Sequence, residues 1–190
     1  DLEGFKRGRI LDKVGMEAQD TAELFFDDMK VPADSLLGED TGQGFIQLMT
    51  ELPQERLNIA VQGVAAMEKA LRHTIEYVKD RKAFGKSILD FQNTQFELAE
   101  IKTIVTVCKV FTYDCAAKHL RGELDTVTAS MAKYWVTDRE CEVMDRCLQL
   151  FGGYGFMNEY LIGRQWRASR VQRIYGGTNE IMKMVIARSL

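Results

Sequence analysis

The chain has 190 residues, of which 46% are hydrophobic and 28% are charged, and its net charge is −3. This length suits one domain, or one domain with part of another, and the apolar residues suffice for a buried core. The charge argues against a protein that follows nucleic-acid phosphates or attaches to membranes through a basic segment, because both need a basic surplus.

Proline, cysteine and apolar residues are distributed as in a helical protein of a reducing compartment. The two prolines, Pro32 and Pro53, leave room for long helices. No run of 18 apolar residues predicts a membrane span, and the N-terminal residues do not resemble a secretion signal. The cysteines, which lack metal-binding spacing and are expected to be buried thiols, are Cys108, Cys115, Cys141 and Cys147. We therefore expect a protein that is not secreted.

Residues 1–41 differ in pattern from the rest of the chain. Glycines and polar pairs interrupt short apolar runs such as Leu24-Phe25-Phe26, and Val31-Pro32 predicts a turn. The segment is therefore expected to form strands and loops. Because it is too short to bury a sheet alone, we interpret it as the C-terminal remnant of a larger β domain.

Residues 42–190 show the three- and four-residue spacing of amphipathic helices. A first helix is predicted from about Phe45 through Val78, with Pro53 predicting a kink, or a second start capped by Thr50. Further helices, separated by glycine-containing breaks, are predicted at about 91–121, 125–150, 161–169 and 178–190. Three long and two short helices predict an all-α fold, an antiparallel helical bundle domain over 42–190.

Two classes of catalytic site lack their residues. A di-iron site in a bundle needs Glu-x-x-His pairs, and neither His73 nor His119, the two histidines of the sequence, follows a glutamate at that spacing. A Ser-His-Asp hydrolase needs a nucleophile elbow, and no suitable motif occurs. The sequence therefore predicts neither site, and no metal.

Glu55 is the first candidate for acid–base chemistry. On a helix it borders the apolar stripe that includes Leu52 and Ile59. If the carboxylate is buried there, its pKa rises, which suits a general base. The alternative, favoured by spacing alone, is an ion pair with Arg56 or with a neighbouring helix.

Three further motifs suit ligand binding, and each has an ordinary structural alternative. The basic turn 81–86 offers an arginine fork for phosphate, or is a solvated loop. The glycine turn 149–156 permits close backbone approach, or simply ends a helix. In 174–181, Thr178 is expected to cap the last helix, whose free N–H groups favour an anionic or carbonyl ligand. An ordinary capped helix would show the same pattern.

Together these motifs resemble the acyl-CoA dehydrogenase family. The resemblance rests on Leu-Pro-Gln-Glu-Arg-Leu at 52–57, Arg-Lys-Ala-Phe-Gly-Lys at 81–86, the glycine turn 149–156 and Tyr-Gly-Gly-Thr-Asn-Glu at 175–180. Their order and spacing match the family over all 190 residues. The resemblance implies the end of a middle β domain followed by the C-terminal helical bundle, with the first half of the family's fold absent.

The resemblance also implies a reaction. Family members are FAD-dependent oxidoreductases of fatty acid β-oxidation that convert an acyl-CoA thioester to trans-2-enoyl-CoA. A glutamate removes the α proton, the flavin accepts a hydride, and an electron-transferring flavoprotein usually reoxidises the flavin. The alternatives are an acyl-CoA oxidase-like flavoenzyme, which uses oxygen, and a non-catalytic helical assembly module. Because part of the site lies upstream, we predict that this chain alone binds FAD poorly and is inactive.

The catalytic base occupies one of two positions in the family. Many members carry it directly after the tyrosine of the last motif, where this chain has Gly176. The long-chain and isovaleryl-type subgroup carries it on the first bundle helix, at the position of Glu55. The resemblance therefore implies Glu55 as the base and this subgroup as the most similar.

Other positions match the family's binding residues. Arg56, Tyr175 and Gly177 match substrate-side positions. Four positions match contacts to the FAD nucleotide of a neighbouring subunit: Arg81, Phe84, Gln149 and Gly153. Thr178 and Glu180 match contacts to the flavin within the same subunit. A shared site implies a homodimer or homotetramer, and the family implies a bacterial cytoplasm or the mitochondrial matrix.

Overall fold

The computed structural model describes residues 2–190, which divide into two compact units, Asp1–Glu51 and Leu52–Leu190. The first unit contains the strands β1 (Phe5–Ile10) and β2 (Ala22–Phe26), which pair antiparallel with Phe5 opposite Phe26. A short 3-10 turn, η1 (Ala33–Ser35), follows.

The hairpin of the first unit leaves apolar side chains exposed. Leu24, Phe25 and Phe26 are each more than half exposed, although the rings of Phe5 and Phe26 contact each other at 5.4 Å. A two-stranded hairpin with such a surface is marginal by itself, because it has no second layer to cover its apolar face. The expected strand remnant is thus confirmed.

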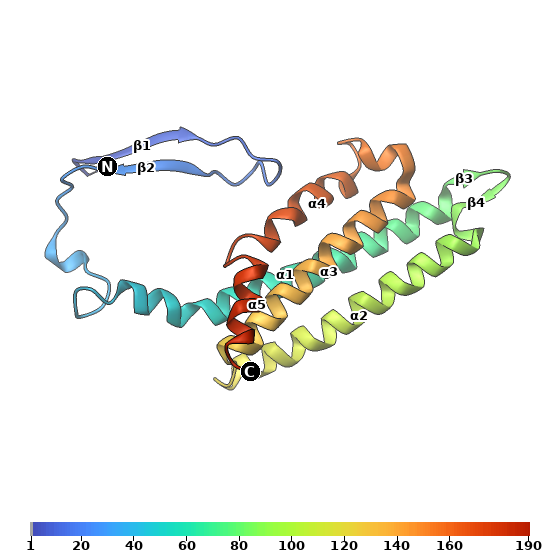
Figure 1. Cartoon of the computed structure of the whole chain (residues 1–190). Helices are drawn as coiled ribbons and strands as arrows, with labels where there is room; N and C mark the ends of the chain where they lie inside the picture. Colours follow the sequence, from blue (N-terminus) through green and yellow to red (C-terminus); the bar gives the residue numbers. More distant parts are fainter. Residues whose placement is uncertain (1) are drawn as a thin grey trace. The chain divides into compact units, whose positions relative to one another are not determined.

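Five helices make up most of the remaining chain (Figure 1). They are α1 (Gly44–Asp80), α2 (Gln92–Leu120), α3 (Thr126–Phe151), α4 (Leu161–Ser169) and α5 (Asn179–Ala187). The shorter elements between them are β3 (Lys82–Ala83), β4 (Lys86–Ser87), η2 (Ile88–Asp90), η3 (Gly152–Phe156) and η4 (Arg170–Arg173). The predicted all-α bundle is confirmed.

Local capping chemistry accounts for the starts of α3 and α5 and for the end of α3. The Asp125 carboxylate accepts a hydrogen bond from the Thr128 N–H at 2.8 Å and so begins α3. The Thr178 hydroxyl accepts from the Ile181 N–H at 3.4 Å at the start of α5. Gly152 ends α3 with φ of 58°, a conformation that glycine adopts without strain.

Pro53 lies inside α1, which continues through it. The predicted second helix start at Thr50 is therefore wrong: the Thr50 hydroxyl donates to the carbonyl of Ile46 within the helix, 2.9 Å away. Proline removes one backbone donor but its φ remains helical. The helix therefore tolerates Pro53, and the buried face of α1 begins just after it, at Arg56 and Leu57.

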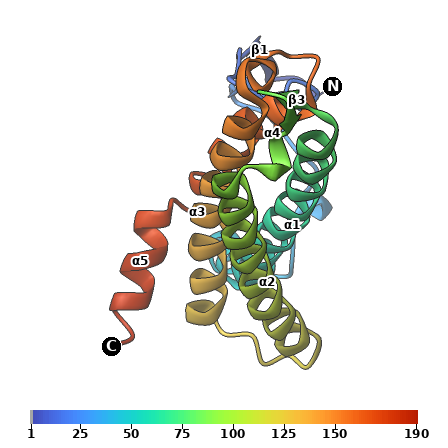
Figure 2. The ribbon, with the colours of Figure 1, turned by 90° about the vertical axis from the view of Figure 1, so that its right-hand side faces the viewer.

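The core lies between α1, α2 and α3, with α3 also packed against α4 and α5 (Figure 2). In Figure 2, α5 lies on the far side of α3 from α2, which leaves the start of α5 at the edge of the bundle. No helix within residues 2–190 is sufficiently long and apolar to cross a membrane. The loop predicted after α1 is a small hairpin of β3 and β4.

Candidate active site

The predicted site residues form two groups within Leu52–Leu190. One group surrounds the Gly176-Gly177 turn, which joins η4 to α5 and contacts α1. The other lies where α1 ends and α3 passes into η3. We call them the α5 turn group and the η3 pocket.

Gly176 leaves little space for a side chain. A Cβ atom at this position would lie 2.5 Å from Cδ1 of Ile59 on α1, and the φ of Gly176 is 62°. A larger residue would therefore displace Ile59 and hold a backbone conformation that side chains disfavour. A carboxylate at 176 would therefore require the end of the Ile59 side chain to move and a left-handed backbone at a non-glycine residue.

Glu55 lies on the same face of α1 as Ile59, one helical turn earlier. Since Ile59 contacts Gly176, this face of α1 is directed to the turn. The Glu55 side chain is exposed, so a carboxylate is available on the helix that faces the turn.

Arg56 is buried beside the same turn, with 4% of its surface exposed. Its Nη1 donates to Oγ of Ser130 on α3 at 3.1 Å, and its Nε has no hydrogen-bond partner among residues 2–190. Its Nη2 lies 4.0 Å from the position that a Cβ on Gly177 would occupy. Burial lowers the pKa of the Arg56 guanidinium, and the neighbouring Glu55 charge opposes that shift. Arg56 thus places a buried cation at the turn.

Tyr175 and Glu180 flank the turn on its two sides. The Tyr175 hydroxyl donates to Oε1 of Gln172 at 2.7 Å, and burial raises its pKa, with Glu140 adding to the shift. Glu180 is exposed at the start of α5. Its own backbone N–H and then the Thr178 hydroxyl lower its pKa by hydrogen bonding to the carboxylate.

The η3 pocket has a volume of about 680 Å3. It gathers three predicted residues from separate parts of the chain, Arg81, Gln149 and Gly153. The other residues that line it are Tyr77, Ala83, Ile88, Leu150, Phe151, Gly152, Tyr154 and Met157. Most of the lining residues that the structure describes are apolar or aromatic, and Arg81 is the one cation among them.

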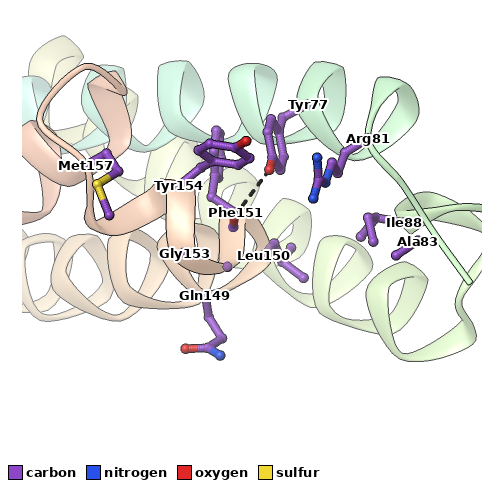
Figure 3. Close-up of a pocket in the computed structure, with 11 residues that line it drawn as sticks. Tyr77, Arg81, Ala83, Ile88, Gln149, Leu150, Phe151, Gly153, Tyr154 and Met157 are labelled. Carbon is purple, nitrogen blue, oxygen red and sulfur yellow. Dashed lines mark hydrogen bonds between the residues drawn. The ribbon is translucent and has the colours of Figure 1, made fainter.

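Stacked aromatic rings form the wall of the η3 pocket (Figure 3). The rings of Tyr77 and Phe151 stack at 4.1 Å, and the Tyr77 hydroxyl donates to the Phe151 carbonyl at 3.2 Å. The Arg81 guanidinium lies 5.4 Å from the centre of the Tyr154 ring. In Figure 3 the Gln149 side chain extends away from the two tyrosines.

The pocket has the groups that a nucleotide diphosphate needs. Arg81 is exposed and offers a planar donor set for phosphate oxygens. At Gly152 and Gly153, no atom of the described chain lies within 4 Å of the position of a Cβ, so a ligand can approach the backbone. The aromatic wall offers a stacking surface.

Phe84 does not line this pocket. It lies between β3 and β4 with 96% of its surface exposed and a φ of 52°. Its ring meets that of Phe91 edge-on, with centroids 6.3 Å apart. The structure therefore brings together three of the four residues predicted to reach a neighbouring subunit's nucleotide, and places the fourth on a projecting hairpin.

Sequence reasoning missed several residues of both groups. Tyr77 and Tyr154 were not singled out, although Tyr154 lies within the glycine turn 149–156 and Tyr77 lies four residues before the basic turn 81–86. Lys133 and Glu140 are charged yet buried on α3. Their signal was available, because both fall at the spacing of the apolar residues of that helix, three or four positions from Val136.

Comparison with known proteins identifies the family. The family model described as acyl-CoA dehydrogenase, C-terminal domain, matches residues 42–190. This chain belongs to the acyl-CoA dehydrogenase family. The predicted family is thus confirmed, and acyl-CoA dehydrogenases as a family are FAD-dependent oxidoreductases.

Similar family members come from mitochondria and bacteria. The chain is 51% identical to the mitochondrial long-chain specific acyl-CoA dehydrogenase of Mus musculus, over 100% of this chain and 44% of that protein. It is 38% identical to the short-chain specific acyl-CoA dehydrogenase of Megasphaera elsdenii, over 98% of this chain and 49% of that one.

A solved family member has the same fold. The acyl-CoA dehydrogenase of Geobacillus kaustophilus superposes with a TM-score of 0.96 at 49% identity, over 100% of this chain and 50% of that one. The chain therefore spans about half the length of the relatives that it matches.

Proposed function

We propose that this chain is the C-terminal half of an FAD-dependent acyl-CoA dehydrogenase, with Glu55 as the base. One observation carries the assignment of the base: Gly176 has no side chain and Ile59 occupies the adjacent space, while Glu55 offers a carboxylate on the same face of α1. The β strands of the first unit then belong to a middle domain completed upstream.

In this mechanism Glu55 takes the α proton of the acyl-CoA thioester as the β hydrogen departs as hydride, which leaves a trans-2-enoyl-CoA. FAD, when bound, supplies the hydride acceptor. Negative charge develops on the thioester as the α proton leaves. Arg56 is a buried cation beside Gly177, so it favours that charge, because Coulomb attraction is strong where water is excluded.

The residues of both groups fit FAD. Thr178 and Glu180 would contact the flavin within the subunit, near Tyr175 and the acyl chain. Arg81, Gln149 and Gly153 would hold the diphosphate and adenine of a neighbouring subunit's FAD in the η3 pocket. The exposed Phe84 would be covered by the same contact, since a fully exposed aromatic ring gains from burial.

This arrangement has consequences for assembly and location. A site shared between subunits needs a homodimer or homotetramer, and the chain alone would hold FAD weakly and turn over little. An electron-transferring flavoprotein would reoxidise the reduced enzyme. Mitochondrial and bacterial relatives suggest the mitochondrial matrix or a bacterial cytoplasm.

The test uses the complete enzyme, which is this chain together with its proposed N-terminal half. Palmitoyl-CoA or butyryl-CoA is added without oxygen, and bleaching of the flavin absorbance is followed. We expect wild type to bleach, and Glu55→Gln to retain FAD but bleach at least roughly 100-fold more slowly. Glu76→Gln, which removes an exposed carboxylate further along α1, is the control. Equal rates for wild type and Glu55→Gln would refute the base.

A further inference from the structure

Lys133 is a fully buried lysine in the N-terminal third of α3. Its Nζ donates to the carbonyl of Gly177 at 2.8 Å and to Oδ1 of Asn179 at 2.9 Å. Both acceptors are neutral, and both lie at the turn that leads into α5. The ammonium therefore connects the bundle interior directly to the α5 turn group.

A wider polar network supports this connection. Asn179 Nδ2 donates to Oγ1 of Thr137 at 3.0 Å and to Oδ1 of Asp138 at 3.0 Å, both on α3. Asp138 in turn pairs with Nε of Arg173 in η4 at 2.6 Å. The network thus joins α3 to both flanks of the turn.

The turn itself needs such support. Gly176 and Gly177 have φ of 62° and 91°, and glycine is the residue with the greatest backbone freedom. Within residues 2–190, the N–H groups of Gly177 and Thr178 donate no backbone hydrogen bond. The hydrogen bond from Lys133 to the Gly177 carbonyl therefore restrains a turn that its own backbone hydrogen bonds do not hold.

This bond also sets the direction of a peptide group. The peptide between Gly177 and Thr178 is planar and trans, so its C=O and N–H point in opposite directions. With the carbonyl held by Lys133, the Thr178 N–H points away from Lys133. If this peptide were rotated by half a turn, the Gly177 carbonyl, an acceptor, would take the place of the Thr178 N–H, a donor, on the side away from Lys133.

Burying an ammonium is costly, which argues that Lys133 is not a packing residue. Burial lowers its pKa to about 8. Four charges face it: Asp138 of α3 and Glu180 of α5 raise the pKa, whereas Arg56 of α1 and Arg173 of η4 lower it. An apolar side chain of the same length would fill the space without the desolvation cost.

We propose that Lys133 is a positioning residue, which holds the Gly176-Gly177 turn and the Thr178 peptide in the orientation that receives the acyl-CoA and the flavin. This inference rests on the proposed function of the α5 turn group. Lys133 touches no reacting atom, and acts through Gly177 and Asn179.

The test compares three variants of the complete FAD-loaded enzyme. Lys133→Met keeps the length and removes the donors, while Lys133→Arg keeps charge and donors. Val143→Ala, at a fully buried apolar position of the same helix, lowers stability without touching the turn. The measurements are kcat and KM with palmitoyl-CoA and butyryl-CoA, thermal unfolding, and amide hydrogen exchange at 175–180.

We expect Lys133→Met to accelerate exchange at 175–180 and to lower kcat/KM roughly 100-fold, because small displacements of positioning groups have such effects. Lys133→Arg should recover part of the loss, and Val143→Ala should lose thermal stability but keep its kcat/KM. The proposal is overturned if Lys133→Met and Val143→Ala have equal kcat/KM and equal exchange at the turn.

Two outcomes separate this proposal from the proposed function. If wild type never reacts with either acyl-CoA, the function fails, while hydrogen exchange still decides whether Lys133 holds the turn. If Lys133→Met does not fold, Asn179→Ser removes one of the two acceptors, and we expect a smaller change of the same kind. An Asn179→Ser enzyme with wild-type exchange and kinetics would overturn the proposal.

Discussion

The two glycine turns of the helical unit are supported in different ways. Buried polar side chains, Lys133 and Arg56, meet the turn at Gly176-Gly177. Stacked aromatic rings underlie the turn at Gly152-Gly153, where Arg81, the one cation among the described lining residues, is exposed (Figure 3). Hydrogen bonds are directional, whereas a stacking surface accepts a ring in several orientations. The turn at Gly176-Gly177 therefore has its backbone atoms held in place, and the turn at Gly152-Gly153 lies beside a flat surface for binding.

This difference fits the division of labour in the proposed enzyme. Proton and hydride transfer need reacting atoms held within a narrow range of distance, and the α5 turn group supplies fixed groups. Nucleotide binding needs area and a phosphate donor, and the η3 pocket supplies both while staying open to a second subunit.

The largest effect is expected from filling the first turn. Gly176→Val places a β-branched residue at φ of 62° and against Ile59, so we expect the unfolding free energy to fall by roughly 2 kcal/mol or more. Gly153→Ala is the matched control, because its Cβ meets no atom of the described chain within 4 Å. Urea unfolding measures both, and equal stabilities would contradict the contrast.

The next effect concerns the cation of the η3 pocket. Arg81→Met should weaken FAD binding by roughly 10- to 100-fold, since charge-assisted hydrogen bonds to phosphate contribute about 1.5–3 kcal/mol. Its thermal stability without FAD should match wild type, because the side chain is exposed. Titration of apoenzyme with FAD, beside Lys82→Met as control, checks this. If the FAD affinity of Arg81→Met were unchanged, Arg81 would not be an FAD-binding residue.

Glu140 tests the polar interior around the first turn. It is 2% exposed, its Oε2 has no hydrogen-bond partner among residues 2–190, and burial raises its pKa from 4.5 to about 8. The folded state therefore holds a proton that the unfolded state releases above pH 4.5. Stability from this group is complete below pH 4.5 and is lost as pH rises through about 8.

Glu140→Gln keeps the shape of the protonated side chain and removes this titration. We expect its unfolding free energy to vary less between about pH 5 and about pH 8, where Glu140 contributes a slope of up to about 1.4 kcal/mol per pH unit. Thermal and urea unfolding across this range provide the measurement. A slope as steep as that of wild type would show that Glu140 is ionised in the folded protein.

The smallest effect is expected in the aromatic wall. Tyr77→Phe removes the hydrogen bond to the Phe151 carbonyl but keeps the stacked rings, so stability should fall by about 1 kcal/mol. FAD affinity should change less than threefold, because the surface remains. If Tyr77→Phe weakened FAD binding as much as Arg81→Met, the directional hydrogen bond of Tyr77, and not the stacking surface, would determine FAD affinity in this pocket.

Some helix boundaries could be predicted closely from the sequence because they have a local cause. Asp125 and Thr178 cap α3 and α5, and Gly152 ends α3, all within a residue or two of prediction. Pro53 misled because a proline removes one backbone donor but keeps a helical φ, so α1 continues through it. Hydrophobic periodicity therefore predicted which segments are helical better than it predicted where a helix is interrupted.

The site was predictable only in part. Arg81, Gln149 and Gly153, which match FAD contacts in the family, line one pocket, whereas Phe84 lies apart on the hairpin of β3 and β4. Lys133 was missed because a helical pattern does not show whether a charged residue in the apolar register is buried. Tertiary contacts with the turn, distant in sequence, decide that.

The most direct test of Glu55 as the base separates proton transfer from flavin chemistry. A complete enzyme is incubated in D2O with a 3-thia acyl-CoA, which cannot lose a β hydride, and deuterium entry at the α carbon is followed by mass spectrometry. We expect exchange by wild type and by Glu76→Gln, and none above the uncatalysed rate by Glu55→Gln. Exchange by Glu55→Gln at the wild-type rate would contradict the proposed role of Glu55.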